Sequence, residues 1–281
     1  MTAVPPELEA KQAALTARLR EAGRVIVAFS GGVDSSYLAF AAHCALGRDA
    51  LCVTAVSPSY PRSHRLMAEQ IVAEHGLFHR FVDTGEMARE GYRRNRADRC
   101  YFCKTELFEV LDEVASELGF HAVAYGINTD DKRDFRPGHK AAKEHGILSP
   151  LVDAGLSKQE IRLLSRAARL PTADLPASAC LSSRLAYGLE VTPERLRQVE
   201  EGEAALHALG FRQIRLRHHG AVARIEVDPA ELARALDPKM AQAMVEKIKP
   251  LGFRWVSLDL EGYRTGSLNA ALSDAERARA E

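Results

Sequence analysis

A run of small and polar residues near the amino terminus could hold a phosphate group. The segment SGGVDSS, residues 30–36, directly follows the apolar run VIVAF, which is typical of a strand buried on both faces. A strand-to-helix junction offers free backbone N–H groups to an anion, the glycines let the backbone wrap it closely, and the hydroxyls add donors. Because a carboxylate at Asp34 would repel a bare phosphate, a bridging magnesium ion is implied. The alternative is a tight turn with a Ser or Asp cap. The residues predicted to hold the phosphates and the magnesium ion are Ser30, Gly31, Gly32, Asp34, Ser35 and Ser36.

Three of the five cysteines are placed where a thiolate could react or bind a metal. Cys100 and Cys103 form a C-x-x-C pair at the start of an expected helix, behind four arginines at positions 93–99, and cations and a helix N-terminus both favour thiolate. By itself the pair could be a redox couple, half of a zinc site or two ordinary thiols. Cys180 lies in a loop of small residues that would leave its sulfur accessible. Cys44 and Cys52 lie in apolar surroundings and are expected to be inert core residues.

Three candidate thiolate ligands leave one coordination position open. This is the arrangement expected of a [4Fe–4S] cluster with one reactive iron, and we predict such a cluster on Cys100, Cys103 and Cys180. Zinc is the alternative, but it would need a further ligand, and the sequence places none of the ten histidines next to the pair.

The apolar pattern predicts an α/β protein with a doubly wound parallel sheet and a smaller C-terminal α+β domain. Strands are expected over 24–29, 50–56, 78–82 and 121–125, and helices over 7–21, 37–46, 64–75 and 103–118. Prolines and small residues after position 170 form a linker. Beyond it we expect helices over 193–209 and 229–248 and strands over 213–217, 223–227 and 254–258. The predicted domains are therefore residues 1–170 and 171–281.

The composition argues against several classes of protein. The chain has 38 Lys and Arg and 38 Asp and Glu, so it has no overall basic field that would hold nucleic-acid phosphates, and a nucleic-acid partner is not expected. The N-terminal residues lack an apolar signal segment and the apolar runs are only strand-length, so we expect a cytoplasmic protein without a membrane span. An odd number of cysteines without a secretory signal speaks against a disulfide framework.

The phosphate loop resembles that of a known superfamily. The sequence contains no G-x-x-x-x-G-K-[ST] motif and no G-x-G-x-x-G after a strand, so kinase-type and dehydrogenase-type loops are not supported. SGGVDSS matches the PP-loop signature of ATP pyrophosphatases, whose fold is adenine nucleotide alpha hydrolase-like. The resemblance implies that ATP is bound and that AMP is transferred to a substrate oxygen. This oxygen is a poor leaving group, and the AMP ester makes its displacement by a weak nucleophile feasible. Gly126 is also assigned to the nucleotide site. Asp130 and Asp131 lie at the ligand edge of the expected sheet, but could equally form a turn.

Further motifs point to one PP-loop family. They are RCYFCK, YGINTDD at 125–131, PASACLSSR around Cys180, RLRHHGAVARIEV at 215–227 and GYRTGS at 262–267. Together with SGGVDSS they resemble the ATP-dependent sulfur transferase that makes pyridinium-3,5-bisthiocarboxylic acid mononucleotide, the precursor of the nickel-pincer nucleotide cofactor of lactate racemase. The likeness covers nearly the whole chain.

The resemblance assigns an anionic substrate, a pyridinium carboxylate mononucleotide, to the C-terminal domain. Arg184, Arg215 and Arg217 are expected to bind its phosphate and carboxylates, since alternating arginines on one strand face can each bind phosphate through two N–H groups. The alternative is a solvated charged strand face. Glu226 and Glu203 are expected as acidic members of the same site.

The resemblance also assigns the sulfur to Cys180. One branch of the family sacrifices this cysteine sulfur and leaves dehydroalanine, whereas another has two additional cysteines and uses a [4Fe–4S] cluster to pass on a sulfide. The presence of Cys100 and Cys103 makes this chain resemble the second branch, and the sacrificial route stays open. A sulfide or persulfide donor and a homo-oligomer are expected as partners. The competing functions are a PP-loop tRNA thiolase and a non-catalytic ATP-binding module.

Overall fold

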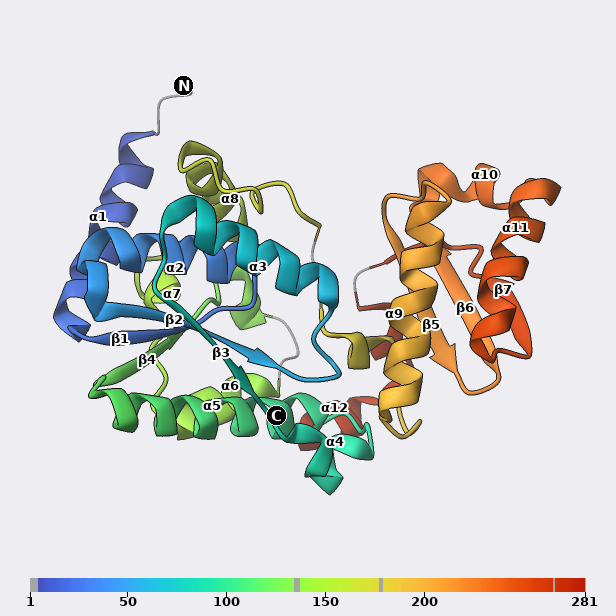
Figure 1. Cartoon of the computed structure of the whole chain (residues 1–281), viewed down its shortest axis with the longest axis horizontal. Coiled ribbons are helices and arrows are strands. Elements are labelled where there is room, and N and C mark those ends of the chain that lie inside the picture. Colours follow the sequence, from blue (N-terminus) through green and yellow to red (C-terminus); the bar gives the residue numbers. More distant parts are fainter. Residues whose placement is uncertain (1–4, 134–136, 177–178, 265, 281) are drawn as a thin grey trace. The chain divides into compact units, whose positions relative to one another are not determined.

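The protein divides into two compact units. The computed structural model describes residues 5–133, 137–176, 179–264 and 266–280 (Figure 1). The first unit comprises Met1–Glu86 and Cys100–Ser178, and the second comprises Met87–Arg99 and Ala179–Ala280. Residues 87–99, which the sequence analysis placed in the first domain, therefore pack with the second unit. Positions 177 and 178 of the cysteine loop, position 265 of the GYRTGS motif and positions 1–4 lie outside the described residues.

A four-stranded parallel sheet forms the centre of the first unit. Its strands are β1 (Val25–Ala28), β2 (Ala50–Val56), β3 (His79–Asp83) and β4 (Ala122–Tyr125). Their order is β3-β2-β1-β4, and every neighbouring pair is parallel. The chain thus moves outward from β1 through β2 and β3 and then returns to the other side of β1. The predicted doubly wound α/β fold is confirmed, and its topological switch point lies between β1 and β4, where such sheets bind ligands.

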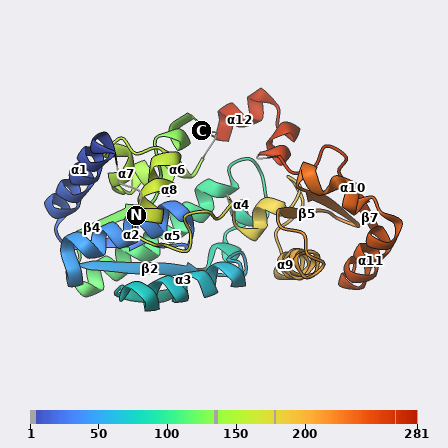
Figure 2. The same ribbon diagram turned by 90° about the horizontal axis from the view of Figure 1, so that it is seen from above.

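Helices cover both faces of this sheet, as Figures 1 and 2 show. Helices α2 (Val33–Leu46), α3 (Arg62–His75) and α8 (Lys158–Ala167) lie over one face, with α1 (Pro6–Ala22) and α7 (Pro150–Asp153) packed nearby. Helices α5 (Arg99–Leu118) and α6 (Gly138–Glu144) cover the other. Successive residues of β1 therefore enter opposite cores, Val27 on the α2 side and Ile26 on the α5 side.

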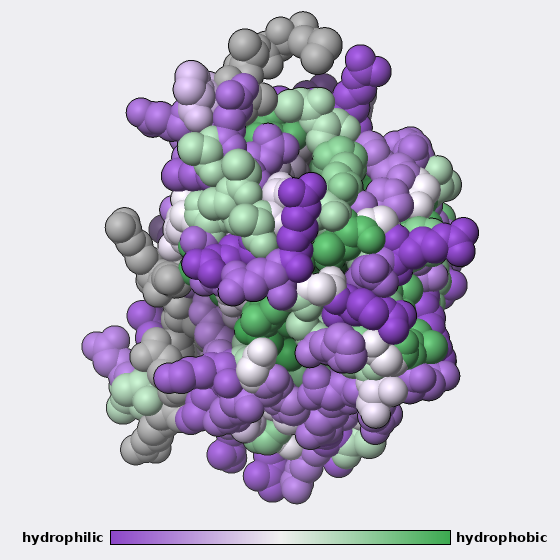
Figure 3. Space-filling model, turned by 90° about the vertical axis from the view of Figure 1, so that its left-hand side faces the viewer, coloured by the Kyte–Doolittle hydropathy of each residue, from purple (hydrophilic) through white to green (hydrophobic). Residues whose placement is uncertain are grey.

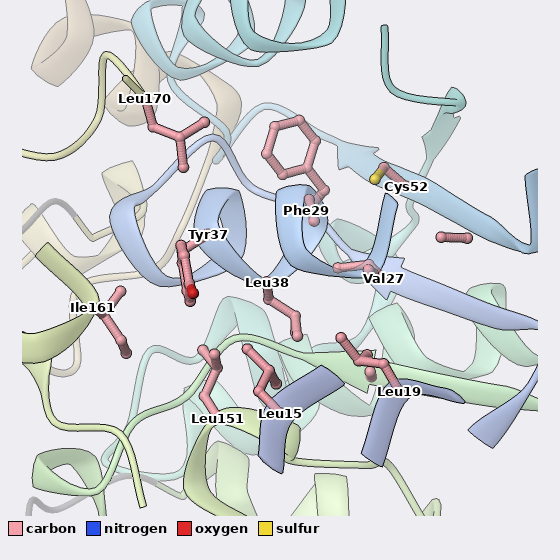
Figure 4. Packing of buried hydrophobic residues seen from close by; sticks show 14 of the residues in the cluster. Leu15, Leu19, Val27, Phe29, Tyr37, Leu38, Cys52, Leu151, Ile161 and Leu170 are labelled. Atoms are coloured by element: carbon pink, nitrogen blue, oxygen red, sulfur yellow. The ribbon is translucent and has the colours of Figure 1, made fainter. Parts of the chain in front are cut away.

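The α2 side holds the larger core. Leu38 of α2 packs among Leu15 and Leu19 of α1 and Leu151 of α7, and all four side chains have no exposed surface (Figure 4). Complete burial of a leucine side chain contributes roughly 1.5 to 3 kcal/mol relative to exposure. This packing fixes α2, whose first residues form part of the phosphate loop.

The second unit is a small mixed sheet with helices on one face. Its strands β5 (Ile214–His219), β6 (Val222–Val227) and β7 (Trp255–Leu258) lie in this order, with β5 antiparallel and β7 parallel to β6. Helices α9 (Pro193–Ala208) and α11 (Pro238–Ile248) pack against each other, and α9 packs on β5. The short elements of this unit are α4 (Glu90–Arg93), the 3₁₀ turn η4 (Leu181–Arg184), α10 (Leu232–Ala235) and α12 (Asp274–Ala280).

Two predicted helices differ from the structure in ways that bear on function. The predicted helix over 229–248 is wrong, because Asp237 accepts hydrogen bonds from two backbone N–H groups and Pro238 follows at the first helical position, so that a new helix, α11, begins there. Helix α5 begins at Arg99 rather than at residue 103, so both Cys100 and Cys103 lie within its first turns.

The two remaining cysteines differ in their surroundings. Cys52 is buried in the core as expected, but the prediction for Cys44 is wrong, because this side chain is exposed on α2. All five cysteines lie among the described residues, and none of them forms a disulfide.

The surface is mixed in character. Hydrophilic residues predominate on the face drawn in Figure 3, with smaller hydrophobic areas between them. None of the helices within the described ranges is long and apolar enough to cross a membrane. The expected cytoplasmic location and homo-oligomeric state stay predictions.

Candidate nucleotide and cysteine sites

The phosphate loop is closed by hydrogen bonds of its own side chains. Ser35 Oγ accepts from Ser30 N at 3.2 Å, lies 3.0 Å from Ser30 Oγ and donates to Gly32 O at 3.2 Å. Gly31 has a φ of +73°, and a Cβ there would lie 2.8 Å from His64 O, so no other residue fits without a shift of the backbone. The loop is thus a built structure rather than a simple capped turn, because Gly32 at the N-cap has no capping side chain.

Gly126 lies against this loop. It follows β4 directly, and a Cβ at this position would lie 2.6 Å from Ser35 N and 2.8 Å from the Asp34 carbonyl carbon. The start of α2 and the residue that follows β4 therefore lie close together at the switch point of the sheet. The structure brings Gly126 together with the six predicted loop residues.

Asp34 forms a partly buried ion pair that the sequence analysis missed. Its Oδ2 lies 2.7 Å from Lys158 Nζ, while Oδ1 is buried and makes no hydrogen bond of standard geometry with the described residues. Burial raises the pKa of Asp34 and Lys158 opposes this shift. The sequence does contain a signal for Lys158, because Ser157 and Glu160 form a capping box that places this lysine at the first position of α8.

The acidic residues after β4 form both a turn and part of this site. Asn128 Oδ1 accepts from Asp130 N at 2.9 Å, and Asp131 Oδ2 accepts from Asn128 Nδ2 at 2.8 Å. Asp130 Oδ2 also accepts from Lys158 N at 2.9 Å, and the charge of Asp131 raises the pKa of Asp34. Asp34 and Asp131 are thus two carboxylates close enough for the charge of one to affect the other, and Asp34 Oδ1 has no donor of standard geometry among the described residues. Magnesium takes carboxylate oxygens of this kind as ligands. The residues present therefore fit the predicted magnesium ion.

A second buried carboxylate lies at the same edge of the sheet. Glu86, only 3% exposed, accepts hydrogen bonds from Ser57 at 2.5 Å, Ser59 at 3.0 Å and Thr84 at 2.8 Å. The sequence analysis did not single out these residues, since a Glu among hydroxyl residues forms no recognised motif. Their network fixes the loops that follow β2 and β3.

Cys100 and Cys103 lie three residues apart in α5 and so project from the same side of the helix. Both side chains are partly exposed. A Cβ at Gly138 would lie 2.8 Å from Lys104 Cγ and 3.5 Å from Cys100 O, so the start of α6 lies against this turn. These thiols belong to the first unit and Cys180 to the second.

No group of three or more His, Cys, Asp or Glu side chains within the described part of the chain could hold a metal ion. Thiolates are nevertheless the ligands that iron–sulfur clusters take, so the donor chemistry of the three cysteines fits the predicted cluster. The cluster stays a prediction.

The backbone at Cys180 is firmly anchored. Its carbonyl oxygen accepts from Ser183 N at 3.0 Å, Ser183 Oγ at 2.8 Å and Arg184 Nη1 at 2.9 Å. Arg184 is 2% exposed, binds the carbonyl of Ala179 as well, and donates from Nε and Nη2 to the two carboxylate oxygens of Glu203 at 3.0 and 3.1 Å. All three guanidinium nitrogens of Arg184 thus have partners that hold the cysteine loop. Its role as an anion ligand stays a prediction.

Arg215 and Arg217 share one face of β5, opposite the face that packs on α9. Arg217 donates to Glu226 Oε2 from Nε and Nη2 at 3.0 and 2.8 Å and to Ser183 O at 3.1 Å. Arg215 lies over the ring of Tyr263, 5.0 Å from its centroid. Burial lowers the pKa of Arg215, and the positive charge of Arg184 adds to this shift. The alternative of a solvated strand face is wrong, because both arginines are less than a tenth exposed.

Comparison with known proteins decides the family. The chain is 42% identical over 266 residues to an uncharacterized protein of Synechocystis sp., a match covering 95% of this chain and 99% of that protein. It is 34% identical over 272 residues to the pyridinium-3,5-bisthiocarboxylic acid mononucleotide synthase of Lactiplantibacillus plantarum, covering 96% of this chain and 98% of the synthase. The chain belongs to this synthase family. No protein-family model matches it.

A third comparison agrees with the fold of the first unit. A subunit of the glutamine-hydrolyzing GMP synthase of Methanopyrus kandleri is 28% identical over 202 residues, covering 66% of this chain and 63% of that protein. This match and the parallel sheet with its SGGVDSS loop after β1 are consistent with a PP-loop fold. Both the superfamily and the synthase family expected from the motifs are therefore confirmed.

The predicted site residues of this synthase family member fall into three groups. The loop residues and Gly126 lie together in the first unit, and the C-x-x-C pair lies in the same unit on α5. Arg184, Arg215, Arg217 and Glu226 lie together with the Cys180 loop in the second unit, where Ser183 contacts both Arg184 and Arg217.

Proposed function

We propose that this protein is an ATP-dependent sulfur transferase that converts a carboxylate of pyridinium-3,5-biscarboxylic acid mononucleotide into a thiocarboxylate. The observation that carries the proposal is the match to the bisthiocarboxylic acid mononucleotide synthase over 96% of the chain, which spans both units. The carboxylate attacks the α-phosphorus of ATP and releases pyrophosphate. A sulfide then attacks the acyl carbon, so that AMP leaves with the former carboxylate oxygen, and no oxidation or reduction is needed.

The first unit supplies the nucleotide half of this reaction. The N–H groups at the start of α2 would bind phosphate oxygens, and Asp34 would bind the magnesium ion that neutralises them. Lys158 is a cation at the same carboxylate, so it would either contact a phosphate or compensate Asp34 when no metal is bound. The first of these roles would stabilise the negative charge that builds up on the departing pyrophosphate.

The second unit supplies the site for the anionic substrate. Arg215 lies buried beside two further arginines, and such a cluster of positive charge gains most when an anion joins it. Glu226 compensates part of this charge, since it accepts from Arg217 on one oxygen and from Arg224 on the other. The substrate phosphate and carboxylates would add further anionic partners to this cluster.

Cys180 is proposed to supply or hold the sulfur. A [4Fe–4S] cluster on Cys100, Cys103 and Cys180 would leave one iron able to carry the sulfide that is transferred. Without a cluster, the sulfur of Cys180 would itself be transferred and the residue would become dehydroalanine. In either case the three hydrogen bonds at the Cys180 carbonyl fix the backbone from which the thiol extends.

The nucleotide half is tested by incubation with ATP, magnesium and the biscarboxylated nucleotide, with separation of the products. AMP, pyrophosphate and thiocarboxylate are expected, whereas ADP and orthophosphate as the sole products would overturn the proposal. Asp34→Ala and Lys158→Ala should each lower turnover by roughly a hundredfold, the scale of losing one charge-stabilising contact. Arg80→Ala is the control, because Arg80 pairs with Glu117 at 3.1 Å in the same unit and lies outside the phosphate loop and α8.

The sulfur half is tested on anaerobically purified protein by iron and sulfide analysis and by mass spectrometry after turnover. A cluster predicts iron in the protein and an unaltered Cys180, and Ser in place of Cys100, Cys103 or Cys180 should remove the iron. Cys44→Ser is the control and should leave iron content unchanged. Dehydroalanine at Cys180 with no iron would exclude the cluster and leave the sulfur-transfer assignment in place.

A further inference from the structure

The segment before the C-x-x-C pair is bound to the segment after Cys180. Residues 87–99 and 179–191 both belong to the second unit although about ninety positions separate them. Backbone hydrogen bonds join Gly188 N to Asn95 O at 2.9 Å and Val191 N to Arg93 O at 2.8 Å. None of these four hydrogen-bonded residues has a part in the chemistry proposed above.

Asn95 is the centre of this contact. Its side chain has no exposed surface and its φ is +51°, a conformation that asparagine tolerates better than most residues. Nδ2 donates to Ala186 O at 2.8 Å and Leu189 O at 3.0 Å, with Leu185 O at 3.3 Å, and Oδ1 accepts from Arg99 at 2.6 Å. One side chain therefore holds three backbone carbonyls within residues 185–189, which follow the cysteine loop.

Two neighbours of Asn95 reach closer to the cysteine. Arg99 Nη1 donates to Ser182 O at 2.8 Å, and Tyr92 OH lies 2.5 Å from Ser182 Oγ. Tyr92 and Ser182 have no exposed surface and Arg99 is 5% exposed, so water does not compete with these hydrogen bonds. Ser182 is thus held from both its carbonyl and its hydroxyl, two positions after Cys180.

We propose that Tyr92, Asn95 and Arg99 are positioning residues for the Cys180 thiol. Arg184 and Ser183 hold the carbonyls at positions 179 and 180, and these three residues hold positions 182–189, so the backbone on both sides of the thiol is immobilised. A group that transfers sulfur must be kept near its productive position, because a displacement of about 1 Å can cost roughly a hundredfold in rate. The inference rests on the role proposed for Cys180, but its structural claim can be tested without sulfur transfer.

The test uses two variants of the central residue. Asn95→Asp keeps the shape but turns the donor that faces three carbonyls into an acceptor, and Asn95→Gly keeps the positive φ but removes the side chain. Gln198→Ala is the control, because Gln198 is a buried amide of the same unit whose partners, Leu251 O at 2.8 Å and His218 Nε2 at 2.9 Å, both lie outside residues 179–191.

The first measurement is the alkylation rate of each thiol in metal-free protein, followed by peptide mass spectrometry. Both Asn95 variants should raise the rate at Cys180 and the amide hydrogen exchange of residues 181–191 by about tenfold or more, as expected when a local opening becomes easier. The exposed thiol of Cys44 is the internal reference and should not change. Gln198→Ala should leave the Cys180 rate within about twofold of the wild type.

The second measurement is the ratio of thiocarboxylate to pyrophosphate formed. The Asn95 variants should release pyrophosphate but lose thiocarboxylate, a split that general destabilisation would not produce. An unchanged Cys180 rate in both variants, or an equal change in Gln198→Ala, would overturn the inference. If wild-type protein transfers no sulfur, the proposed function fails while the alkylation result still decides the positioning role. Should Asn95→Asp fail to fold, Asn95→Gly alone decides it.

Discussion

The contact between Gly126 and the phosphate loop predicts a large effect from one methyl group. In Gly126→Ala the new Cβ would lie 2.6 Å from Ser35 N, about 0.8 Å short of the 3.4 Å at which ordinary contact begins. Both nearest atoms are backbone, so neither can turn aside as a side chain would. Relief of the overlap requires the start of α2 or the end of β4 to shift, at a cost of roughly 1 to 3 kcal/mol. A shift of this size at the phosphate-binding N–H groups should lower turnover by about a hundredfold.

The assay for Gly126→Ala measures ATP binding by calorimetry and pyrophosphate release by a coupled reaction, beside thermal unfolding. Gly85→Ala is the control, because its Cβ would meet only the flexible carboxylate of Glu106 at 3.2 Å. The control should keep both binding and turnover. Wild-type ATP affinity and turnover in Gly126→Ala would refute the contact, whereas equal losses in Gly85→Ala would refute the distinction between backbone and side-chain neighbours.

Two further predictions concern the stability of the second unit. Glu226→Ala leaves the buried Arg217 without its carboxylate and should lower the free energy of unfolding by about 3 to 5 kcal/mol, while the exposed Glu201→Ala should cost about 0.5 kcal/mol or less in the same denaturant titration. Burial lowers the pKa of His218, which lies 2.9 Å from Gln198 Oε1, to about 4, below its ordinary value of 6.5. The unfolded chain therefore binds this proton first, and the free energy of unfolding should fall as the pH drops from about 6.5 towards 4, by something on the order of 1 to 3 kcal/mol. His218→Asn should flatten this part of the pH profile, and an unchanged profile would contradict the assignment of a neutral buried histidine.

The sequence predicts the first unit well because its signals are local. The continuous apolar runs of β1 and β2 are typical of strands covered on both faces, and the glycines of the SGGVDSS segment mark the turn that follows β1. The glycine at position 31 has the positive φ that this turn requires. Alternation on β5 likewise predicts that Arg215 and Arg217 share a face, and the register of β5 with β6 places both beside Glu226 and Arg224.

The parts that the sequence does not predict depend on contacts between distant residues. Lys158 is separated from Asp34 by 124 positions, and only the packing of α8 on α2 brings their side chains together. Arg184 was expected to bind substrate because of its motif. In the structure its guanidinium nitrogens donate hydrogen bonds to Glu203 and to a carbonyl of the cysteine loop. A buried arginine that holds a protein loop and a buried arginine that binds a ligand can have the same sequence pattern.

Within the part of the chain that the structure describes, the chain passes from one unit to the other three times, after Glu86, after Arg99 and after position 178. The last two crossings lie directly before Cys100 and two residues before Cys180. Cys100 and Cys180 thus lie just after points where the chain enters a new unit. Each has a buried arginine near it in sequence, Arg99 or Arg184, whose hydrogen bonds lie within the second unit. A sacrificial mechanism would need only Cys180, whose anchors are complete within that unit. Arg99 is one of these anchors, because it donates to Ser182 O, and it also directly precedes Cys100, so a cluster mechanism would give the same side chain a second role.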